Sequence, residues 1–349
     1  MVFVHNERWA SFMSFAGAFF WALLAALAGA QRAPLGVMEL LLLFALLVVV
    51  PLGLELATVL SPANWPAFEN LARVLQPPAA MCAVGACWFG PGTTSGLLAL
   101  PWAAVAGLVA LSGVAGLRSS KSVVAFVSNL ARIDLGIAGG WLLVSRLGVR
   151  PIGLQEPIIL LTAIHFHYAG FGTALIAAAG IQFAERYKVE RRLWHIAGLA
   201  IALLPFAVAL GFVFSPLLKV VAAVVFAACV TVLALLLWRQ SAHLLLQSAR
   251  AFVRAACLFI FAGMALAAVY AVGNYLGREW LTVPRMASTH GWMNGMGFVM
   301  PGLLGWLAEL NHRSRSSGER RQHSESISAR VKVDVAPLPK FVAREFHDL

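Results

Sequence analysis

The sequence predicts an all-α protein of the polytopic membrane class, a transmembrane helix bundle of about ten spans with both termini cytoplasmic. The composition supports this fold class, because hydrophobic residues make up 60% of the chain and charged residues only 12%. A soluble globular domain carries about 25% charged residues. The mean hydropathy is +0.82, and the apolar residues gather in runs of about 20, the length that crosses a bilayer. Lipid is therefore the expected solvent for most of the chain.

The apolar runs divide residues 1–310 into ten candidate spans, and residues 311–349 form a polar tail. Each span is expected to be helical, because lipid offers no hydrogen-bond partner to an open backbone group. The first span ends in Ala28-Gly29-Ala30, which a signal peptidase could accept, but its apolar stretch is long for a signal peptide, so a retained helix is preferred. The predicted spans are residues 10–30, 36–60, 75–91, 96–117, 122–147, 157–184, 193–214, 218–238, 252–276 and 286–308.

Lysine and arginine residues in the loops predict the orientation, because cytoplasmic loops carry an excess of them. The richer side includes Arg73, Arg118 and the cluster from Arg186 to Arg192, and it also receives the basic tail. Both termini are therefore expected in the cytoplasm. This requires an even number of spans, in agreement with ten, of which the third is the weakest.

The formal net charge is +11. In a soluble protein this charge would suggest nucleic acid, but here it lies in loops and in the tail, so we expect a lipid bilayer and no nucleic acid as partner. The tail mixes Ser, Arg and Glu and cannot bury a core, which predicts disorder. A solvated tail that sets the topology is the simpler interpretation. The alternative is contact with anionic lipid headgroups through Arg313, Arg315, Arg320 and Arg321.

Two histidines lie in the middle of the sixth span, where polar groups are costly and indicate function. With a rise of about 1.5 Å per residue from the outer end near Glu156, His165 is about 13 Å deep and His167 about 16 Å deep. Two helical steps rotate by about 200°, so the two imidazoles point to opposite faces. One metal ion cannot easily take both, but partners on opposite sides of the helix could each take one, with Tyr168 as a supporting residue.

The tenth span contains His290 and Asn294, which are four residues apart and share one face of a helix, about 6 and 12 Å deep. Gly291 and Gly295 form a GxxxG pattern, which lets another helix approach closely. Two interpretations stay open. His290 contributes to a site in the outer half of the membrane, or His290 and Asn294 only form hydrogen bonds across a helix interface.

The fifth span carries Arg132 and Asp134, which also lie deep in the membrane and on opposite faces. Asp134 lies at the depth of His167 and could orient a ligating imidazole from behind, as carboxylates do in metal sites. Alternatively, it pairs with an arginine of another helix. Arg132 requires a carbonyl, a carboxylate or a water molecule as its partner.

The segment His165-Phe166-His167-Tyr168 resembles the HFHY element of subunit I of the heme-copper oxidases. In that family the two histidines of one transmembrane helix ligate two different hemes, so the resemblance implies that His165 and His167 are axial heme ligands. The copper motifs of the family, HPEVY and a neighbouring His-His pair, are absent from this sequence, as is a second-helix histidine for the low-spin heme. The resemblance therefore does not imply a copper centre or oxygen reduction.

A broader resemblance covers most of the membrane part. HFHYAGF in the middle of the chain, together with THGWMNGMGF from Thr289 to Phe298, is similar to the YndJ-like family of bacterial integral membrane proteins. This resemblance implies a multispan fold, a place in the bacterial inner membrane and importance of the two motifs. It implies no reaction.

Three functions remain open, and the sequence does not decide whether the protein is an enzyme. The first is redox or metal chemistry with a heme or a transition metal bound by His165, His167 and His290. The second is a transporter of a small solute, protons or a lipid-linked substrate, in which the membrane histidines and Asp134 form the path. The third is a non-catalytic membrane component. The supporting residues in the first case are Tyr168, Asp134, Asn294 and Arg132.

Overall fold

The computed structural model describes residues 7–316, and in this range every regular element is helical. Eight of the helices are long and apolar enough to cross a membrane. Both findings confirm the all-α multispan prediction. The α-helices are α1 (Glu7–Gly29), α2 (Val37–Phe44), α3 (Val50–Leu60), α4 (Pro66–Trp88), α5 (Thr93–Ser119), α6 (Val123–Leu147), α7 (Ile158–His165), α8 (Ala174–Tyr187), α9 (Arg191–Phe214), α10 (Pro216–Ser241), α11 (Gln247–Tyr275) and α12 (Val283–Met286).

Three of the long helices are interrupted by π-helical turns, which are wider than α-helical turns. Segment η1 (Ala45–Val49) joins α2 to α3, and η3 (Phe166–Thr173) joins α7 to α8. Segments η4 (Ala287–Gly291) and η5 (Met293–Val299) follow α12 in what we call the C-terminal helix, residues 283–308. π-helical turns are rare and occur frequently at functional sites. Segments η1, η3 and η5 pack against one another, so the irregular turns of three helices meet at one place.

Polar residues define several helix ends. The Ser122 hydroxyl accepts a hydrogen bond from the Ala125 amide at the start of α6, and Thr282 does the same for the Arg285 amide at the start of α12. Such caps satisfy amides that have no partner inside the helix. Helix α6 ends at Gly148, whose φ of 73° lies in the left-handed region that glycine adopts without strain.

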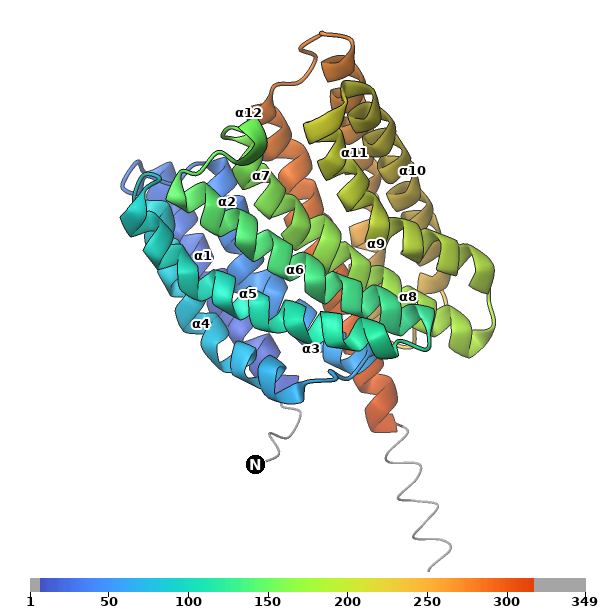
Figure 1. Ribbon diagram of the computed structural model, residues 1–349. Helices are drawn as coiled ribbons and strands as arrows, with labels where there is room; N and C mark the ends of the chain where they lie inside the picture. The colour runs from blue at the N-terminus through green and yellow to red at the C-terminus, as the bar shows by residue number, and fades with distance from the viewer. Residues whose placement is uncertain (1–6, 317–349) are drawn as a thin grey trace, which may run out of the picture. The chain divides into compact units, whose positions relative to one another are not determined.

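Consecutive helices of residues 7–308, which belong to one compact unit, lie side by side (Figure 1). Helices α4, α5 and α6 pack in sequence, and so do α9, α10 and α11. The helix formed by α2, η1 and α3 and the helix formed by α7, η3 and α8 are the central ones. Their most apolar windows are 78% and 72% buried inside the protein, whereas that of α1 is 17% buried.

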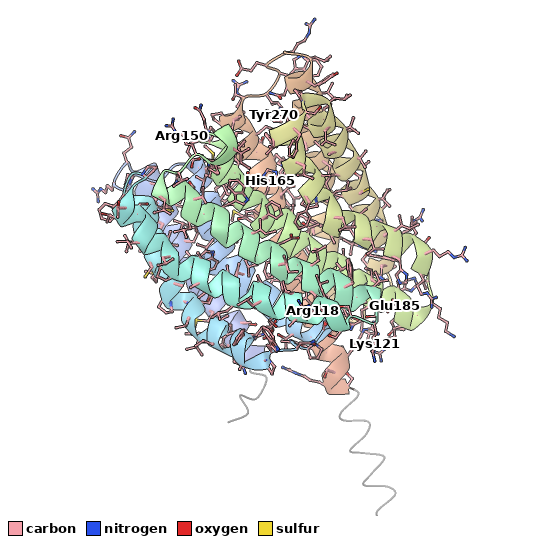
Figure 2. The ribbon with its side chains drawn as sticks, viewed as in Figure 1. Arg118, Lys121, Arg150, His165, Glu185 and Tyr270 are labelled. Carbon is pink, nitrogen blue, oxygen red and sulfur yellow. The ribbon has the colours of Figure 1, made fainter. Side chains whose placement is uncertain are left out.

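The chain enters and leaves this unit at the same end of the bundle, where α1 begins and the C-terminal helix finishes (Figure 1). Arg118, Lys121 and Glu185 lie towards this end and Arg150 towards the opposite end (Figure 2). This arrangement is the one that an even number of spans produces. The assignment of this end to the cytoplasm stays a prediction from the positive-inside rule.

Helix α4 differs from the predicted third span, because it begins at Pro66 rather than at residue 75. Arg73, predicted to lie in a loop, is inside this helix, where its Nη1 lies 2.7 Å from Oε2 of Glu55 on α3. The prediction was wrong because hydropathy cannot recognise a helix whose charged side chains are neutralised by neighbours. Helix α4 is accordingly not among the eight helices selected by apolar composition.

A second unit begins at Glu309, and the predicted division into a membrane domain and a tail at residue 311 stays a prediction. In its described part, Nη2 of Arg313 forms an ion pair of 2.5 Å with Oε1 of Glu309. Most of the predicted tail, residues 317–349, lies outside the described residues, so the disorder and the lipid contact of the tail stay predictions.

Candidate functional site

His165 is the last residue of α7, and its imidazole is exposed although it lies within a membrane-spanning helix. Figure 2 shows it between the two ends that the labelled charges mark, nearer the end of Arg150 than the end of Arg118. Its Nδ1 lies 3.0 Å from the carbonyl oxygen of Leu161. A carbonyl oxygen only accepts, so Nδ1 carries the hydrogen and Nε2 presents its lone pair. The hydrogen bonds of the described residues leave this Nε2 without a partner.

His290 on the C-terminal helix faces His165. The two ring centroids are 6.5 Å apart and the ring planes are 27° from parallel. His290 Nδ1 donates to the carbonyl oxygen of Gly263 on α11 at 2.8 Å, and His290 Nε2 accepts from Nδ2 of Asn294 at 2.8 Å. The predicted shared face of His290 and Asn294 is therefore present, and the imidazole is held in one tautomer. The structure thus brings together two histidines that are far apart in the sequence.

His167 lies on the opposite side of the same helix, as its spacing from His165 predicted. Its side chain is completely buried, and Nδ1 donates to the carbonyl oxygen of Ala163 at 2.8 Å. Nε2 accepts a hydrogen bond of 3.2 Å from the indole Nε1 of Trp102 on α5. Both ring nitrogens are therefore occupied by protein groups. In this arrangement His167 has no lone pair to offer a metal.

Tyr168 connects η3 to two other helices. Its hydroxyl donates to the carbonyl oxygen of Leu41 on α2 at 2.7 Å. A Cβ at Gly295 would lie 3.0 Å from the Tyr168 ring, and a Cβ at Gly291 would lie 2.6 Å from a methyl group of Leu41. The GxxxG pattern therefore acts as predicted, since its two glycines let α2 and η3 approach the C-terminal helix closely.

Asp134 of α6 lies against Gly170 of η3. A Cβ at Gly170 would lie 2.8 Å from Oδ2 of Asp134. The carboxylate is completely buried, and neither of its oxygens has a hydrogen-bond partner among residues 7–316. It therefore forms no hydrogen bond with His167, and the predicted orientation of an imidazole by this carboxylate is not present in the structure. The alternative prediction, an ion pair with an arginine of another helix, is not present either.

Arg132 has the partners that its depth required. Its Nε forms an ion pair of 2.5 Å with Oε1 of Glu69 on α4, and Nη2 donates to the carbonyl oxygens of Ala57 and Ser61. The guanidinium is completely buried. Arg132 is therefore part of a structural network between α3, α4 and α6, and it does not contact the histidines.

The histidines can be tested as ligands on their own geometry. Within residues 7–316, no group of three or more His, Cys, Asp or Glu side chains is arranged to hold a metal ion. His165 has a free Nε2, whereas His167 uses its Nε2 for Trp102. The two-heme arrangement implied by the HFHY resemblance needs a free nitrogen on each face of the helix. The residues present fit this arrangement on the His165 face only.

Sequence reasoning missed the partners that decide these roles. Trp102 follows Pro101 inside an apolar run, and nothing in its spacing relates it to His167. Glu69 was assigned to a loop, because the predicted third span began at residue 75. The carbonyl group of Gly263 has no sequence signal at all. The same reason applies to all three partners: each comes from a separate helix and is brought close only by packing.

Comparison with known proteins agrees with the membrane fold and the two motifs. The family model described as "YndJ-like protein" matches residues 40–298. This range contains the second half of α2, all helices from α3 to α11, both histidine motifs and Asp134. The match extends over most of the chain.

A curated relative, the "Uncharacterized membrane protein YndJ" of Bacillus subtilis (strain 168), is 28% identical over 175 residues. The alignment covers 50% of this chain and 31% of that protein, so the chain spans about a third of the relative's length. No solved structure matches. The extent of the family match, together with the eight apolar helices, shows that the chain is a multi-pass membrane protein and belongs to the YndJ-like family.

Proposed function

We propose that this protein binds a transition metal, as an ion or as the iron of a heme, between His165 and His290 in the outer half of the membrane, and that the bound metal has a redox role. One observation carries the proposal. Two imidazoles from different helices face each other with ring centroids 6.5 Å apart, and Nε2 of His165 is free.

The hydrogen bonds of both histidines suit metal ligation. Metal-bound histidines almost always donate their second ring nitrogen to a carboxylate, a carbonyl or water, which fixes the tautomer. His165 donates Nδ1 to the Leu161 carbonyl, and His290 donates Nδ1 to the Gly263 carbonyl. Nε2 is therefore the coordinating atom on each ring.

The separation of the rings is also suitable. A metal–nitrogen bond is about 2.0–2.1 Å long, so two nitrogens on one metal are at most about 4 Å apart. The rings are stacked with centroids 6.5 Å apart, and each Nε2 lone pair lies in the plane of its ring, so the rings have to turn their Nε2 edges towards a shared metal. A second movement is also required. The Asn294 amide, which now donates to His290 Nε2, has to rotate away when His290 binds the metal.

The position of the His165–His290 pair determines which metals suit the site and how they reach it. Imidazole suits iron, copper and zinc, and a redox role requires iron or copper. His165 is exposed, which gives access from outside the packed core. The contacts of η3 with η1 and η5 hold the turn that directly follows His165. With only two histidines from the chain, other coordination positions are open to a porphyrin or to an external ligand.

The test is an optical spectrum of the full chain in detergent, oxidised and dithionite-reduced, with metal analysis of the same sample. Cells are supplied with iron, copper, zinc and a heme precursor during expression. We expect a stoichiometric metal in the wild type and a loss of at least tenfold in His165→Ala and in His290→Ala. His243→Ala serves as the control and should retain the metal, because His243 lies between α10 and α11, 20 residues before Gly263, where α11 contacts His290.

The spectrum distinguishes the two forms of the metal. A Soret band that shifts on reduction identifies heme, and metal without such a band identifies an ion. The proposal is wrong if the wild type contains neither, or if His165→Ala and His290→Ala both keep the wild-type content while remaining folded.

A further inference from the structure

The carboxylate of Asp134 is the buried polar group that the metal site leaves unexplained. Its side chain is completely buried in α6, and both Oδ1 and Oδ2 lack a hydrogen-bond partner within the described residues. An ionised carboxylate in this state is very costly in a protein interior and more so within a membrane. The group must therefore be neutralised by something other than a described hydrogen-bond donor.

No charged neighbour in the described part of the chain neutralises this carboxylate. Arg132, on the same helix, points away and is occupied by Glu69. His167, three residues before Gly170 on η3, uses both ring nitrogens for Ala163 and Trp102. The helices packed against α6 are α3, α5, α7, α8 and α9, together with η3. Among the other titratable or charged groups on these elements, Glu55 is paired with Arg73 and Glu185 is paired with His195. His165 faces His290, and the Tyr168 hydroxyl is bonded to the Leu41 carbonyl. The remaining groups lie near helix ends: Arg118, Arg186, Tyr187, Arg191 and Arg192.

The surface opposite the carboxylate is bare backbone. Gly170 has no side chain, and a Cβ at this position would lie 2.8 Å from both Oδ2 and Cβ of Asp134. Gly170 belongs to the π-helical segment η3, whose hydrogen-bond pattern departs from that of an α-helix. Any change in the volume or charge of the Asp134 carboxyl group therefore acts directly on the turn that follows His165 and contains His167.

From this geometry we infer that Asp134 is a proton-binding site within the membrane. The carboxyl group carries a proton in the observed arrangement and releases it only when water or a donor reaches it through a rearrangement of η3. The inference does not depend on the metal proposal. The inference nevertheless links Asp134 to His165, because a change in η3 alters the position of His165, which directly precedes it, and such coupling is reciprocal. A proton carrier of this kind is what a proton-coupled transport or redox step in the membrane requires.

The small number of aspartates in the chain allows the protonation of Asp134 to be measured specifically. It contains three aspartates, Asp134, Asp334 and Asp348. In the full chain carrying Asp334→Asn and Asp348→Asn, carboxyl-labelled [¹³C]aspartate reports on Asp134 alone by infrared spectroscopy. We expect the band of a protonated carboxyl group at neutral pH and its conversion to a carboxylate band at alkaline pH. The labelled band should be absent after the further change Asp134→Asn.

Thermal unfolding gives a second readout. The unfolded chain ionises its aspartates at neutral pH, so a carboxyl group that stays protonated in the folded protein contributes less stability as the pH rises. The melting temperature of the wild type should therefore fall more steeply between about pH 5 and neutral pH than that of Asp134→Asn, and the difference in slope should vanish at the alkaline pH where the folded carboxyl group itself ionises. Glu279→Gln, which removes an exposed carboxylate in the loop after α11, should keep the wild-type slope.

Two results would overturn the inference. The first is a labelled carboxylate band at neutral pH in the folded protein. If the position of that band or the melting temperature then differs between sodium and potassium buffers, the group binds a metal cation rather than a proton. The second is equal pH dependence of unfolding in the wild type and in Asp134→Asn.

Discussion

The indole Nε1 of Trp102 donates a hydrogen bond of 3.2 Å to Nε2 of His167. Both side chains are completely buried, and the bond joins α5 to η3. His167 is two residues from His165, yet the two imidazoles meet different surroundings. One has both nitrogens occupied inside the packed bundle, and the other has a free nitrogen that faces a second histidine. We therefore expect His167 to serve the packing of α5 against η3, and His165 to be the more available ligand of the two.

Replacing Trp102 by Phe should destabilise the fold without lowering the content of the metal that we propose at His165 and His290. The change leaves Nε2 of His167 buried without its donor, which costs about 1–3 kcal/mol. Thermal unfolding in detergent measures the loss, and Trp65→Phe is the control because Trp65 is 47% exposed. If Trp102→Phe instead keeps its stability but loses the metal, His167 is a ligand after all.

The ion pair of Arg132 and Glu69 should be among the most sensitive contacts. Replacing Glu69 by Gln leaves a buried guanidinium without its counter-charge, and removing one partner of a buried pair costs about 3–5 kcal/mol. The measurement is unfolding in a denaturing detergent. Glu190→Gln provides the comparison, since the Glu190–Arg239 pair is largely exposed and is expected to contribute at most about 1 kcal/mol. Similar effects of the two changes would contradict this account of the network.

Alanine at Gly295 should separate the C-terminal helix from η3. The added Cβ would lie 3.0 Å from the Tyr168 ring, a crowded contact whose overpacking costs about 1–3 kcal/mol. Gly140→Ala is the matched control on α6, because nothing lies within 4 Å of a Cβ there. That change should be neutral or stabilise the helix by up to about 1 kcal/mol. Equal melting temperatures for the two variants would show that the close approach of the helices is not important.

Removing the hydroxyl of Tyr168 tests the contact between η3 and α2. Tyr168→Phe keeps the ring against Gly295 but loses the hydrogen bond of 2.7 Å to the Leu41 carbonyl. The expected loss is about 1 kcal/mol. If η3 is held by this bond, the variant should also bind the metal more weakly than the wild type, as measured by metal content. A loss of stability with unchanged metal content would restrict Tyr168 to a structural role.

Much of the site was predictable as a set of residues but not as a set of contacts. The opposed directions of His165 and His167 follow from helical geometry, and so does the shared face of His290 and Asn294. The division of roles between the two sixth-span histidines could not be predicted, because it depends on Trp102 from another helix. The suggested link between Asp134 and His167 was not observed, since similar depth in the membrane does not make two groups neighbours.

The sequence by itself determined the fold class, the approximate helices and the polar residues that would need partners inside the membrane. The physical reason is that lipid forces each apolar run to satisfy its own backbone as a helix, so local composition is sufficient. The start of α4, the π-helical turns, the facing of His165 and His290, and the isolation of Asp134 were decided only by the tertiary structure. They depend on side chains from separate helices meeting in space, and short-range hydropathy and periodicity carry no information about such meetings.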